Sequence, residues 1–336
     1  MATIYEVSKA AGVSLATVSR VMNGNAKVSD RTRQKVVDAM EALGYKPNAI
    51  AQSLASNRTN SVGLLVSELH GSYFGDLMST IELILKKHGK HVIITAGHVD
   101  ESRETDAIDF LTSRRCDALI VHAEAVTDDY LVSLSNASVP VAVVNRKVNG
   151  LEDKCFVADN VDGGYLATKA VLDKGHRNIG YISGPLFKTD ASDRLTGHKK
   201  ALAEAGISFE PSLMFEGDYH ESSGQEGFTS LLAQHPNMTA LVCANDEMAS
   251  GAMTAAREAG FDLPGQLSVV GFDNAIFCRY LYPKLTTVSN PVRAMGEMAA
   301  HWVLEHVYDI KCPQPVTHIF EPELVLRDSL GPAPHA

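Results

Sequence analysis

Short apolar runs alternate with longer stretches of helical periodicity from residue 62 onward, and this alternation limits the possible folds more than any other feature. Continuous apolar strands are typical of parallel sheets buried on both faces, and parallel neighbours need a crossover connection that is usually a helix. The sequence therefore predicts an α/β body with parallel sheets covered by helices. The expected strands are residues 62–66, 92–95, 118–122, 141–145, 156–158, 179–183, 241–244 and 267–272, and the expected helices are residues 74–88, 103–113, 163–174, 193–205, 222–234 and 247–259.

The body is expected to contain two sheets rather than one. A chain of 336 residues with 45% hydrophobic content can bury a large core and should hold two or three domains. The acidic and polar segment DNVDGG, residues 159–164, marks a break between two similar halves. Each half then supplies its own parallel sheet.

Two short amphipathic segments, residues 4–11 and 15–22, precede the body and are separated by a Gly-Val-Ser turn. Gly12 can adopt the positive φ that ends a helix, and Ser14 can accept a backbone N–H at the start of the next. A third segment follows over residues 29–43, with its first serine as the expected N-cap. The pattern predicts a small three-helix module, which periodicity alone could equally assign to a structural cap. The side chains expected in its core are Ile4, Val7, Ala10, Ala11, Val18, Val21, Val36, Val37, Met40 and Leu43.

Charge is divided unevenly along the chain. Residues 1–60 carry eight Lys or Arg and four Asp or Glu, a net +4, whereas the whole chain is −10, which leaves −14 on residues 61–336. A basic segment attached to an acidic body is the distribution expected when one end of a protein faces nucleic-acid phosphates. This asymmetry favours a DNA-binding module over a structural cap.

The residues of this module are more specific than their periodicity. The segments GVSLATVSRVMNG, VSDRTRQKV and LGYKPNAIAQSLA resemble, without a gap, the helix-turn-helix headpiece of the LacI/GalR family of transcriptional regulators. The resemblance implies that the second helix enters the major groove, with Leu15, Ala16 and Arg20 at the positions that read base edges. It also implies phosphate contacts that position the headpiece. These are expected from Thr3, Ser14, Thr17, Asn23 and Ser29.

Arg20 is the residue of this helix that can contact guanine O6 and N7 with two hydrogen bonds. Leu15 and Ala16 offer only apolar contact, for example to a thymine methyl group. The alternative for Arg20 is a surface charge paired with a carboxylate.

Residues 47–60 are expected to form a hinge helix and linker. Pro47 suits the first turn of a helix, but residues 48–55 are too few to be stable alone, because isolated helices under about a dozen residues are marginal in water. In the family that the sequence resembles, this helix forms on DNA, pairs with that of a dimer mate and inserts a leucine into the minor groove. The resemblance thus implies DNA contacts from Asn48 and from Leu54, which would kink the duplex. The alternative is that Leu54 packs against the body.

The resemblance also implies a body like that of periplasmic sugar-binding proteins, with two lobes and crossings of the chain near Asn160, Asn290 and His318. The expected fold class is therefore α/β, with a small all-α helix-turn-helix headpiece and a two-lobed body with parallel sheets. The expected domains are the headpiece at residues 1–46, the hinge at 47–60, a first lobe at 61–159 with 291–317, and a second lobe at 160–290 with 318–330.

Polar side chains follow several of the expected strands. Asn145 follows VAVV, Asn245 follows LVCA and Asp273 follows VVGF, while Arg194 lies early in an expected helix. Ligands of open parallel sheets bind beyond the carboxyl ends of the strands, so these groups should converge on the cleft between the lobes. Amides, carboxylates and a guanidinium together can satisfy the hydroxyls of a sugar, each of which both donates and accepts.

Aromatic rings that could cover a sugar ring are expected in loops at the same cleft. The segments ANDEMASGAM and VVGFDN also resemble the effector-site segments of the LacI/GalR family, which implies roles for Asn245, Asp273 and Arg194. The residues predicted to bind an effector are Tyr73, Phe74, Asn145, Arg194, Tyr219, Asn245 and Asp273.

Alternatives accompany several of these assignments. Asp246 at the start of a helix could be its N-cap, Asn274 could only shape a turn, and Tyr219 could anchor its loop. Asn145 agrees with the galactose-type branch of the family, since a carboxylate occupies that place in the lactose-type branch. The Tyr73–Phe74 pair is also similar to the base-stacking pair of purine-responsive members. A purine or a phosphosugar therefore stays open beside a neutral sugar as the effector.

Catalysis, cofactors and metals are not expected. The sequence has no G-x-G-x-x-G after a strand, no P-loop, no G-x-S-x-G and no H-E-x-x-H. Its five cysteines are scattered without a C-x-x-C pair, and its 13 histidines show no metal-ligand spacing. With no signal peptide and no apolar run near the roughly 18 residues of a membrane helix, we expect a cytoplasmic protein with no membrane contact.

Together these features predict a sequence-specific transcriptional regulator, most simply a repressor of a carbohydrate-utilisation operon. It would bind a palindromic operator DNA as a homodimer and respond to a small sugar in the cleft. The chain ends without leucine heptads, so a tetramer-forming coiled coil is not expected. The competing function is a soluble sugar-binding protein that does not act on DNA, although the secretion signal of a transport protein is missing.

Overall fold

The structure is a computed structural model that describes residues 2–22, 28–46, 58–137 and 139–334. The chain divides into two compact units, Met1–Ser61 with Arg115–Asp117, and Val62–Arg114 with Ala118–Ala336. We describe the headpiece within the first unit and the body in the second, each by itself.

The headpiece consists of α1 (Ile4–Ala11), α2 (Leu15–Met22) and α3 (Asp30–Ala42). Gly12 has the expected positive φ of 64°, and the hydroxyl of Ser14 accepts the backbone N–H of Thr17 at 3.2 Å. Ser29 caps α3 in the same way by accepting the N–H of Thr32. These caps fix the turn between α1 and α2 and the start of α3. The core consists of Val7, Ala11, Val18, Val21, Val36 and Ala39.

Three residues expected in this core lie outside it: Ala10, Leu43 and the partly buried Val37. Leu43 is 39% exposed and Ala10 is also exposed. Leu43 is the C-cap of α3, one residue beyond its last helical position, so it no longer follows the buried stripe. Ala39 occupies the inward position one turn earlier instead.

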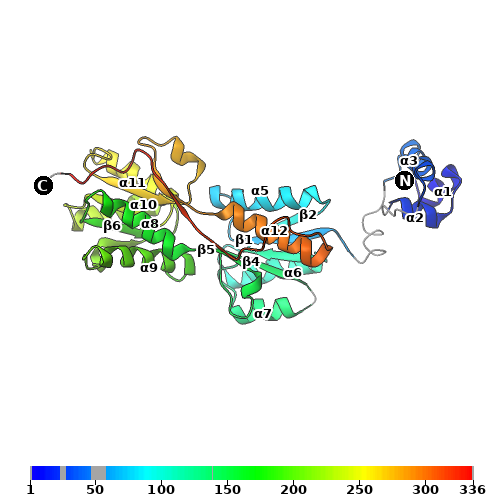
Figure 1. Cartoon of the computed structure of the whole chain (residues 1–336), viewed down its shortest axis with the longest axis horizontal. Helices are drawn as coiled ribbons and strands as arrows, with labels where there is room; N and C mark the ends of the chain where they lie inside the picture. The colour runs from blue at the N-terminus through cyan, green and yellow to red at the C-terminus, as the bar shows by residue number, and fades with distance from the viewer. Residues whose placement is uncertain (1, 23–27, 47–57, 138, 335–336) are drawn as a thin grey trace. The chain divides into compact units, whose positions relative to one another are not determined.

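The first lobe of the body contains a six-stranded sheet in the order β11-β5-β4-β3-β1-β2. The β1–β3, β3–β4, β4–β5 and β5–β11 pairs are all parallel, and strands such as β3 and β4 are wholly buried apolar runs. Figure 1 shows α12 beside α5 over this sheet. Trp302 of α12 is buried in the core of this lobe. The elements are β1 (Ser61–Val66), α5 (Ser72–Lys87), β2 (His91–Ala96), α6 (Glu101–Ser113), β3 (Ala118–Val121), α7 (Asp128–Asn136), β4 (Val141–Val144), β5 (Cys155–Ala158), α12 (Val292–Tyr308) and β11 (Ile319–Phe320).

The second lobe contains another six-stranded sheet, in the order β12-β10-β9-β8-β6-β7. Its pairs are parallel except for the edge strand β12, which runs antiparallel to β10. The helices pack in two pairs, α8 with α9 and α10 with α11. The elements are α8 (Asn160–Asp173), β6 (Ile179–Ser183), α9 (Thr189–Glu204), β7 (Met214–Glu216), α10 (Glu221–Gln234), β8 (Ala240–Cys243), α11 (Asp246–Glu258), β9 (Ser268–Phe272), β10 (Thr286–Ser289) and β12 (Glu323–Val325).

The chain passes between the lobes three times: after β5, between β10 and α12, and between β11 and β12. The last passage differs from the expected one at His318. Ile319 and Phe320 pair with Val157 and Ala158, so this short strand extends the sheet of the first lobe. The second lobe resumes with β12, because the antiparallel ladder to β10 begins at Glu323.

The helices of the body that were expected begin one to four residues earlier than their apolar periodicity indicates. Three of these starts, those of α6, α8 and α11, are held by side-chain caps: Asp100, Asp159 and Asn245 accept the N–H groups of Arg103, Asp162 and Met248. In the described part of the chain, no helix combines the length and apolar character that crossing a bilayer requires.

Candidate functional site

A cavity of about 260 Å³ lies at the carboxyl ends of the strands of both sheets. Asn145 follows β4, Asn245 follows β8 and Asp273 follows β9, as the rule for open parallel sheets predicts. Residues from both lobes line this cavity, and all seven predicted effector residues are among them. The lining includes Ser67, Glu68, Tyr73, Phe74, His122, Glu124, Asn145, Lys188, Asp190, Arg194, Asp218, Tyr219, Asn245, Asp246, Glu247 and Asp273.

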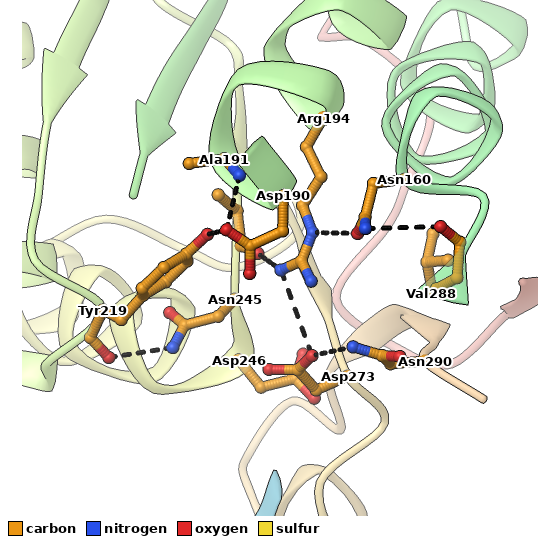
Figure 2. A network of polar contacts seen from close by, with 12 residues as sticks. Asn160, Asp190, Ala191, Arg194, Tyr219, Asn245, Asp246, Asp273, Val288 and Asn290 are labelled. Carbon is orange, nitrogen blue, oxygen red and sulfur yellow. Dashed lines mark hydrogen bonds and ion pairs between the residues drawn. The ribbon is translucent and has the colours of Figure 1, made fainter. Parts of the chain in front are cut away.

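Arg194 is the central cation of the second-lobe wall. The residue is 3% exposed, and its Nε donates to Asn160 Oδ1 at 2.9 Å (Figure 2). Its Nη1 donates to the carbonyl of Ala244 at 2.5 Å. Its Cζ lies 3.7 Å from the centre of the Phe272 ring. These contacts hold the guanidinium group so that its Nη1 lies 4.0 Å from Asp273 Oδ1, at the edge of the cavity.

Two glycines allow the helix that carries Arg194 to approach α8 closely. A Cβ on Gly164 would lie 2.0 Å from the carbonyl oxygen of Arg194, and a Cβ on Gly197 would lie 2.0 Å from that of Val161. Any side chain at either position would separate α8 from α9. The depth of Arg194 in the site therefore depends on these two glycines.

Asp273 lies directly beyond β9 with a positive φ of 112°. Its Oδ1 accepts a hydrogen bond from Asn290 at 3.1 Å, as Figure 2 shows. Burial raises the pKa of Asp273 to about 7, against the opposing effect of Arg194. This carboxylate is therefore poised between its charged and neutral forms near neutral pH.

Asp190, in the first turn of α9, joins the two walls of the cavity. Its Oδ1 accepts from the Tyr219 hydroxyl at 3.2 Å and from the Ala191 N–H at 2.7 Å, while Oδ2 accepts from Asn145 Nδ2 at 3.3 Å. Burial would raise the pKa of Asp190, but Arg194, Lys188 and His122 outweigh it and lower that pKa. The sequence reasoning missed Asp190, although it lies one helical turn before Arg194.

Asn245 has a structural use within the site. Its Oδ1 accepts the N–H of Met248 and so caps α11, and its Nδ2 donates to the carbonyl of Tyr219 at 2.8 Å. The proposed capping role of Asp246 therefore belongs to its neighbour Asn245. The β/extended backbone of Asn245 is the conformation that an N-cap needs, whereas Asp246 is already helical.

Asp246 instead holds the loop after β9. It is 1% exposed, and its carboxylate accepts the N–H of Ala275 at 2.8 Å and the hydroxyl of Thr287 at 2.6 Å. Burial raises the pKa of Asp246 to about 6. Asn274, which was considered a turn-shaping residue, has a positive φ of 58° in this same loop.

Tyr73 and Phe74 lie on the first-lobe side, in the first turn of α5. The pair was expected at a loop, although the predicted helix began at Phe74, so only Tyr73 changes from loop to helix. Their rings meet edge to face with centroids 5.1 Å apart, and each ring also contacts His122 edge to face. The α5 helix starts at Ser72, before the apolar periodicity becomes visible, which explains the difference.

His122 and Glu124 complete the first-lobe wall and were not predicted. The Nδ1 of His122 is 3.2 Å from Ser67 Oγ, and its Nε2 is 3.8 Å from Glu124 Oε1. Burial lowers the pKa of His122 to about 4 and raises that of Glu124 to about 7. His122 follows β3 directly and Glu124 comes two residues later, so the strand-end rule that found Asn145 could have found them.

Several buried polar atoms around the cavity have no hydrogen-bond partner in the described residues. They are Tyr73 Oη, His122 Nε2, Asn145 Oδ1 and Asn290 Oδ1. Buried polar groups are nearly always paired, so such a cluster indicates a place where a ligand with several hydrogen-bonding groups binds. Among the described residues, no cluster of three or more His, Cys, Asp or Glu is arranged to hold a metal ion.

The headpiece presents the predicted DNA-reading residues on one face of α2. Ala16 and Arg20 are exposed and Leu15 is half-buried, while Val18 and Val21 face the core. The hydroxyls of Thr3, Ser14 and Ser29 accept helix N–H groups, and Thr17 Oγ1 is 2.9 Å from Ser14 Oγ. Asn23, Asn48 and Leu54 lie outside the described residues.

A helix-turn-helix headpiece and a two-lobed ligand-binding body define a ligand-responsive transcriptional regulator, not an enzyme. Residues 3–48 match the model of the bacterial regulatory proteins of the lacI family, and residues 168–330 match the periplasmic binding protein-like domain. The chain belongs to the lacI family.

Named relatives are similar over almost the whole chain. The HTH-type transcriptional regulator GalR of Escherichia coli (strain K12) is 40% identical over 98% of this chain and 96% of its own length. GalS of Salmonella typhimurium is 38% identical over 98% of this chain and 97% of its own length. The repressor PurR of Glaesserella parasuis is 34% identical, with 98% of both chains covered.

Solved structures agree with this fold. The Lac repressor dimer bound to operator and the anti-inducer ONPF is 28% identical, with a TM-score of 0.86 and 98% of both chains covered. A complex of the transcriptional regulator CelR with cellobiose is 28% identical, with a TM-score of 0.71, 98% of this chain and 100% of that chain covered.

Proposed function

We propose that this protein is a repressor of a carbohydrate-utilisation operon that binds a palindromic operator as a homodimer and responds to a small sugar in the cavity. The observation that carries the proposal is the polar lining of the cavity. Arg194 and Asp190 come from α9, Asp273 and Asn145 come from two strand ends, and all four border one space of about 260 Å³.

A sugar suits this lining chemically. Each hydroxyl both donates and accepts, and the cavity offers carboxylate acceptors beside guanidinium and amide donors. The unpartnered Tyr73 hydroxyl and Asn145 Oδ1 supply one more donor and acceptor from the first lobe. The GalR and GalS relatives and the cellobiose complex of CelR support a carbohydrate as the ligand class.

Regulation would follow from ligand contacts made by both lobes. The hydrogen bond from Asn145 to Asp190 joins the first lobe to the second at the cavity, so a ligand that inserts its own hydroxyls there favours one lobe arrangement over another. Differential affinity for two arrangements is what shifts an equilibrium between them. The changed spacing of two hinge segments would then alter operator binding by the dimer.

DNA recognition is assigned to α2. We propose that Arg20, Ala16 and Leu15 read base edges, while Thr3, Ser14, Thr17, Asn23 and Ser29 contact phosphates. Asn48 and Leu54 would act in the minor groove. The operator-bound Lac repressor dimer, with a TM-score of 0.86, supports a dimer as the DNA-binding form.

A purine is the second candidate effector, and the Tyr73–Phe74 pair is the observation in its favour. Both rings line the cavity, and the PurR relatives are 34% to 35% identical. A phosphosugar is the third possibility to be included in any ligand screen.

A thermal-shift screen of monosaccharides, disaccharides, phosphosugars and purines tests the proposal. We expect at least one neutral sugar to raise the unfolding temperature of the wild-type protein, because ligand that binds only the folded state stabilises it. Asp273→Ala should abolish that shift. A shift by purines alone would overturn the sugar assignment, and an unchanged shift in Asp273→Ala would remove this residue from the site.

A further inference from the structure

The loop between β3 and α7, residues 122–127, is held rigidly against the cavity by a buried carboxylate. Glu104 of α6 is 0% exposed, and its Oε1 accepts the N–H of Glu124 at 2.9 Å. Its Oε2 accepts the N–H groups of Ala125 and Val126, each at 2.9 Å. A carboxylate that accepts three backbone N–H groups fixes the path of that backbone, since each unmade bond would leave a buried donor unpaired.

Arg146 braces the same loop from its carbonyl side. Its Nη1 donates to the carbonyls of Ala123 at 3.2 Å and Val126 at 2.8 Å, and its Nη2 pairs with Asp128 at 2.5 Å. The loop is therefore held through both its N–H and its C=O groups. The side chain of Glu124, only 9% exposed, is the one carboxylate that this braced loop places on the cavity wall.

Charges of both signs act on Glu124: burial, Asp190 and Glu104 raise its pKa, while Lys188 and Arg146 lower it. Two permanent cations line the cavity in the described residues, Lys188 and Arg194, and Arg194 already donates to Asn160 and to the Ala244 carbonyl. Acidic side chains are in excess over them. The carboxylates are Glu68, Glu124, Asp190, Asp218, Asp246, Glu247 and Asp273.

Independent evidence that a ligand is received at this wall comes from His122 and Asn145. Both are more than nine-tenths buried, at 3% and 7% exposure, and both line the cavity. Yet His122 Nε2 and Asn145 Oδ1 have no hydrogen-bond partner in the described residues. Glu124 Oε1 lies 3.8 Å from that His122 nitrogen, so a ligand group that reaches one also meets the other.

We propose that Glu124 is a specificity-determining residue that rejects carboxylated and phosphorylated sugars, that Glu104 is its positioning residue, and that the effector is an uncharged sugar. This inference rests on the proposed function. An uncharged hydroxyl can donate to the Glu124 carboxylate, whereas an anionic substituent would meet Glu124 on one wall and Asp190 on the other. Like charges brought together in a desolvated site oppose binding strongly.

Calorimetric titration of the full-length protein with matched pairs of ligands tests the role of Glu124. Each pair is a hexose and its hexuronate, for example galactose with galacturonate and glucose with glucuronate, so that charge is the main difference. Burial raises the pKa of Glu124 to about 7, so the titrations are run at pH 8.5, where the carboxylate is ionised. In the wild type, we expect the hexuronate of the best-binding pair to bind at least about 100-fold more weakly than its hexose.

Glu124→Gln should shrink that ratio of dissociation constants by about tenfold or more, because the amide does not repel the hexuronate. The matched control is Asp129→Asn, which removes one negative charge from an exposed position of the neighbouring helix and should leave the ratio unchanged. A ratio in Glu124→Gln equal to that of the wild type would overturn the assignment. So would wild-type protein that binds both members of the best-binding pair equally.

Glu104→Gln tests the positioning role. Because one of its two amide positions cannot accept a hydrogen bond, the loop should loosen, and the hexose-to-hexuronate ratio should shrink in the same direction as in Glu124→Gln. The double variant should show no further loss of discrimination. If Glu104 only stabilised the fold, Glu104→Gln would weaken binding of the hexose and the hexuronate equally, and the ratio of their dissociation constants would stay constant. That result would overturn the positioning role of Glu104.

Two further variants serve as a fallback and a control for the test of Glu104. Glu104→Asp retains the charge if Glu104→Gln fails to fold, and its shorter side chain should also reduce discrimination. Glu101→Gln, an exposed position on the same helix, should leave discrimination unchanged. If no neutral sugar bound, disaccharides included, the proposed sugar effector itself would be overturned, whereas equal binding within the best pair would overturn this inference alone.

Discussion

Asp273 gives the sharpest prediction at the scale of single residues. Its pKa is raised to about 7 by burial, so the folded state holds a proton that the unfolded state, with a pKa near 4, releases. This contribution to stability is fully present below pH 4 and is lost as the pH rises to about 7. Asp273→Asn cannot ionise, so its stability relative to wild type should rise by up to a few kcal/mol between pH 4.5 and 8.

Urea unfolding of the ligand-free protein at a series of pH values measures this effect. The difference in stability between the variant and the wild type cancels the contributions of the other titrating groups, because Glu124, Asp246 and His122 are present in both proteins. A stability difference between Asp273→Asn and wild type that does not change with pH would contradict the assigned pKa.

Arg194→Lys should strongly reduce stability and effector binding, although the substitution keeps the positive charge. Lysine cannot make the hydrogen bonds to Asn160 and to the Ala244 carbonyl from one fork, nor stack its planar group on Phe272. We expect the free energy of unfolding of the body to fall by roughly 2–4 kcal/mol and effector binding to be lost. Retention of wild-type stability in chemical denaturation would show that these buried contacts contribute little.

Arg20→Ala should relax base preference at one position of each half-site. A bidentate contact to guanine supplies roughly tenfold to a hundredfold discrimination, which the variant would lose at that position only. Competition binding with operators altered one base pair at a time measures this. An equal loss of affinity for every DNA sequence would identify Arg20 as a phosphate contact instead.

The residues that the sequence predicted and Asp190, which it missed, differ in one physical respect. Asn145, Asn245 and Asp273 follow buried strands, where the strand-end rule applies directly. Asp190 lies in a helix start that is held by distant partners such as Tyr219, and no local pattern encodes those partners. Glu124 lies close enough to the end of β3 for the strand-end rule, but the contact of its backbone with Glu104 has no local signal.

At the scale of elements, the caps decide where helices begin. Ser29 accepts the N–H of Thr32 at the start of α3, and α3 supplies Val36 and Ala39 to the small core of the headpiece. Ser29→Ala should therefore destabilise the headpiece by about 1 kcal/mol. Amide hydrogen exchange in the intact protein should show faster exchange in α3 and unchanged exchange in α8. Equal acceleration in both helices would indicate a general effect instead.

Periodicity predicted most of the strands and helices but missed α7 (Asp128–Asn136), and it did not predict where the elements end. The polar first turns of α8 and α11 carry no apolar signal, and the short edge strands β7 and β11 are too brief to show a pattern. The placement of Ile319 and Phe320 in the first sheet depends on pairing with β5, which lies far away in the sequence. Such long-range pairing is set by tertiary packing and not by local propensity.

At the scale of the whole molecule, charge asymmetry is the feature most readily visible in the sequence. A headpiece segment with net +4 attached to a body with −14 should bind DNA in a strongly salt-dependent way. The logarithm of the binding constant should fall linearly with the logarithm of salt concentration, with a slope near −0.9 for each phosphate neutralised. A slope near zero would contradict electrostatic binding by the headpiece.

The central claim is that operator and effector act on one another through the two-lobed body. Full-length protein should first enrich a palindromic duplex from a random library, and a sugar found by thermal shift should then be titrated with and without that duplex. We predict that the sugar changes the operator dissociation constant by the same factor by which the operator changes that of the sugar, commonly about 5- to 150-fold. Failure to enrich any palindrome, or two ligands that bind without affecting each other, would contradict it.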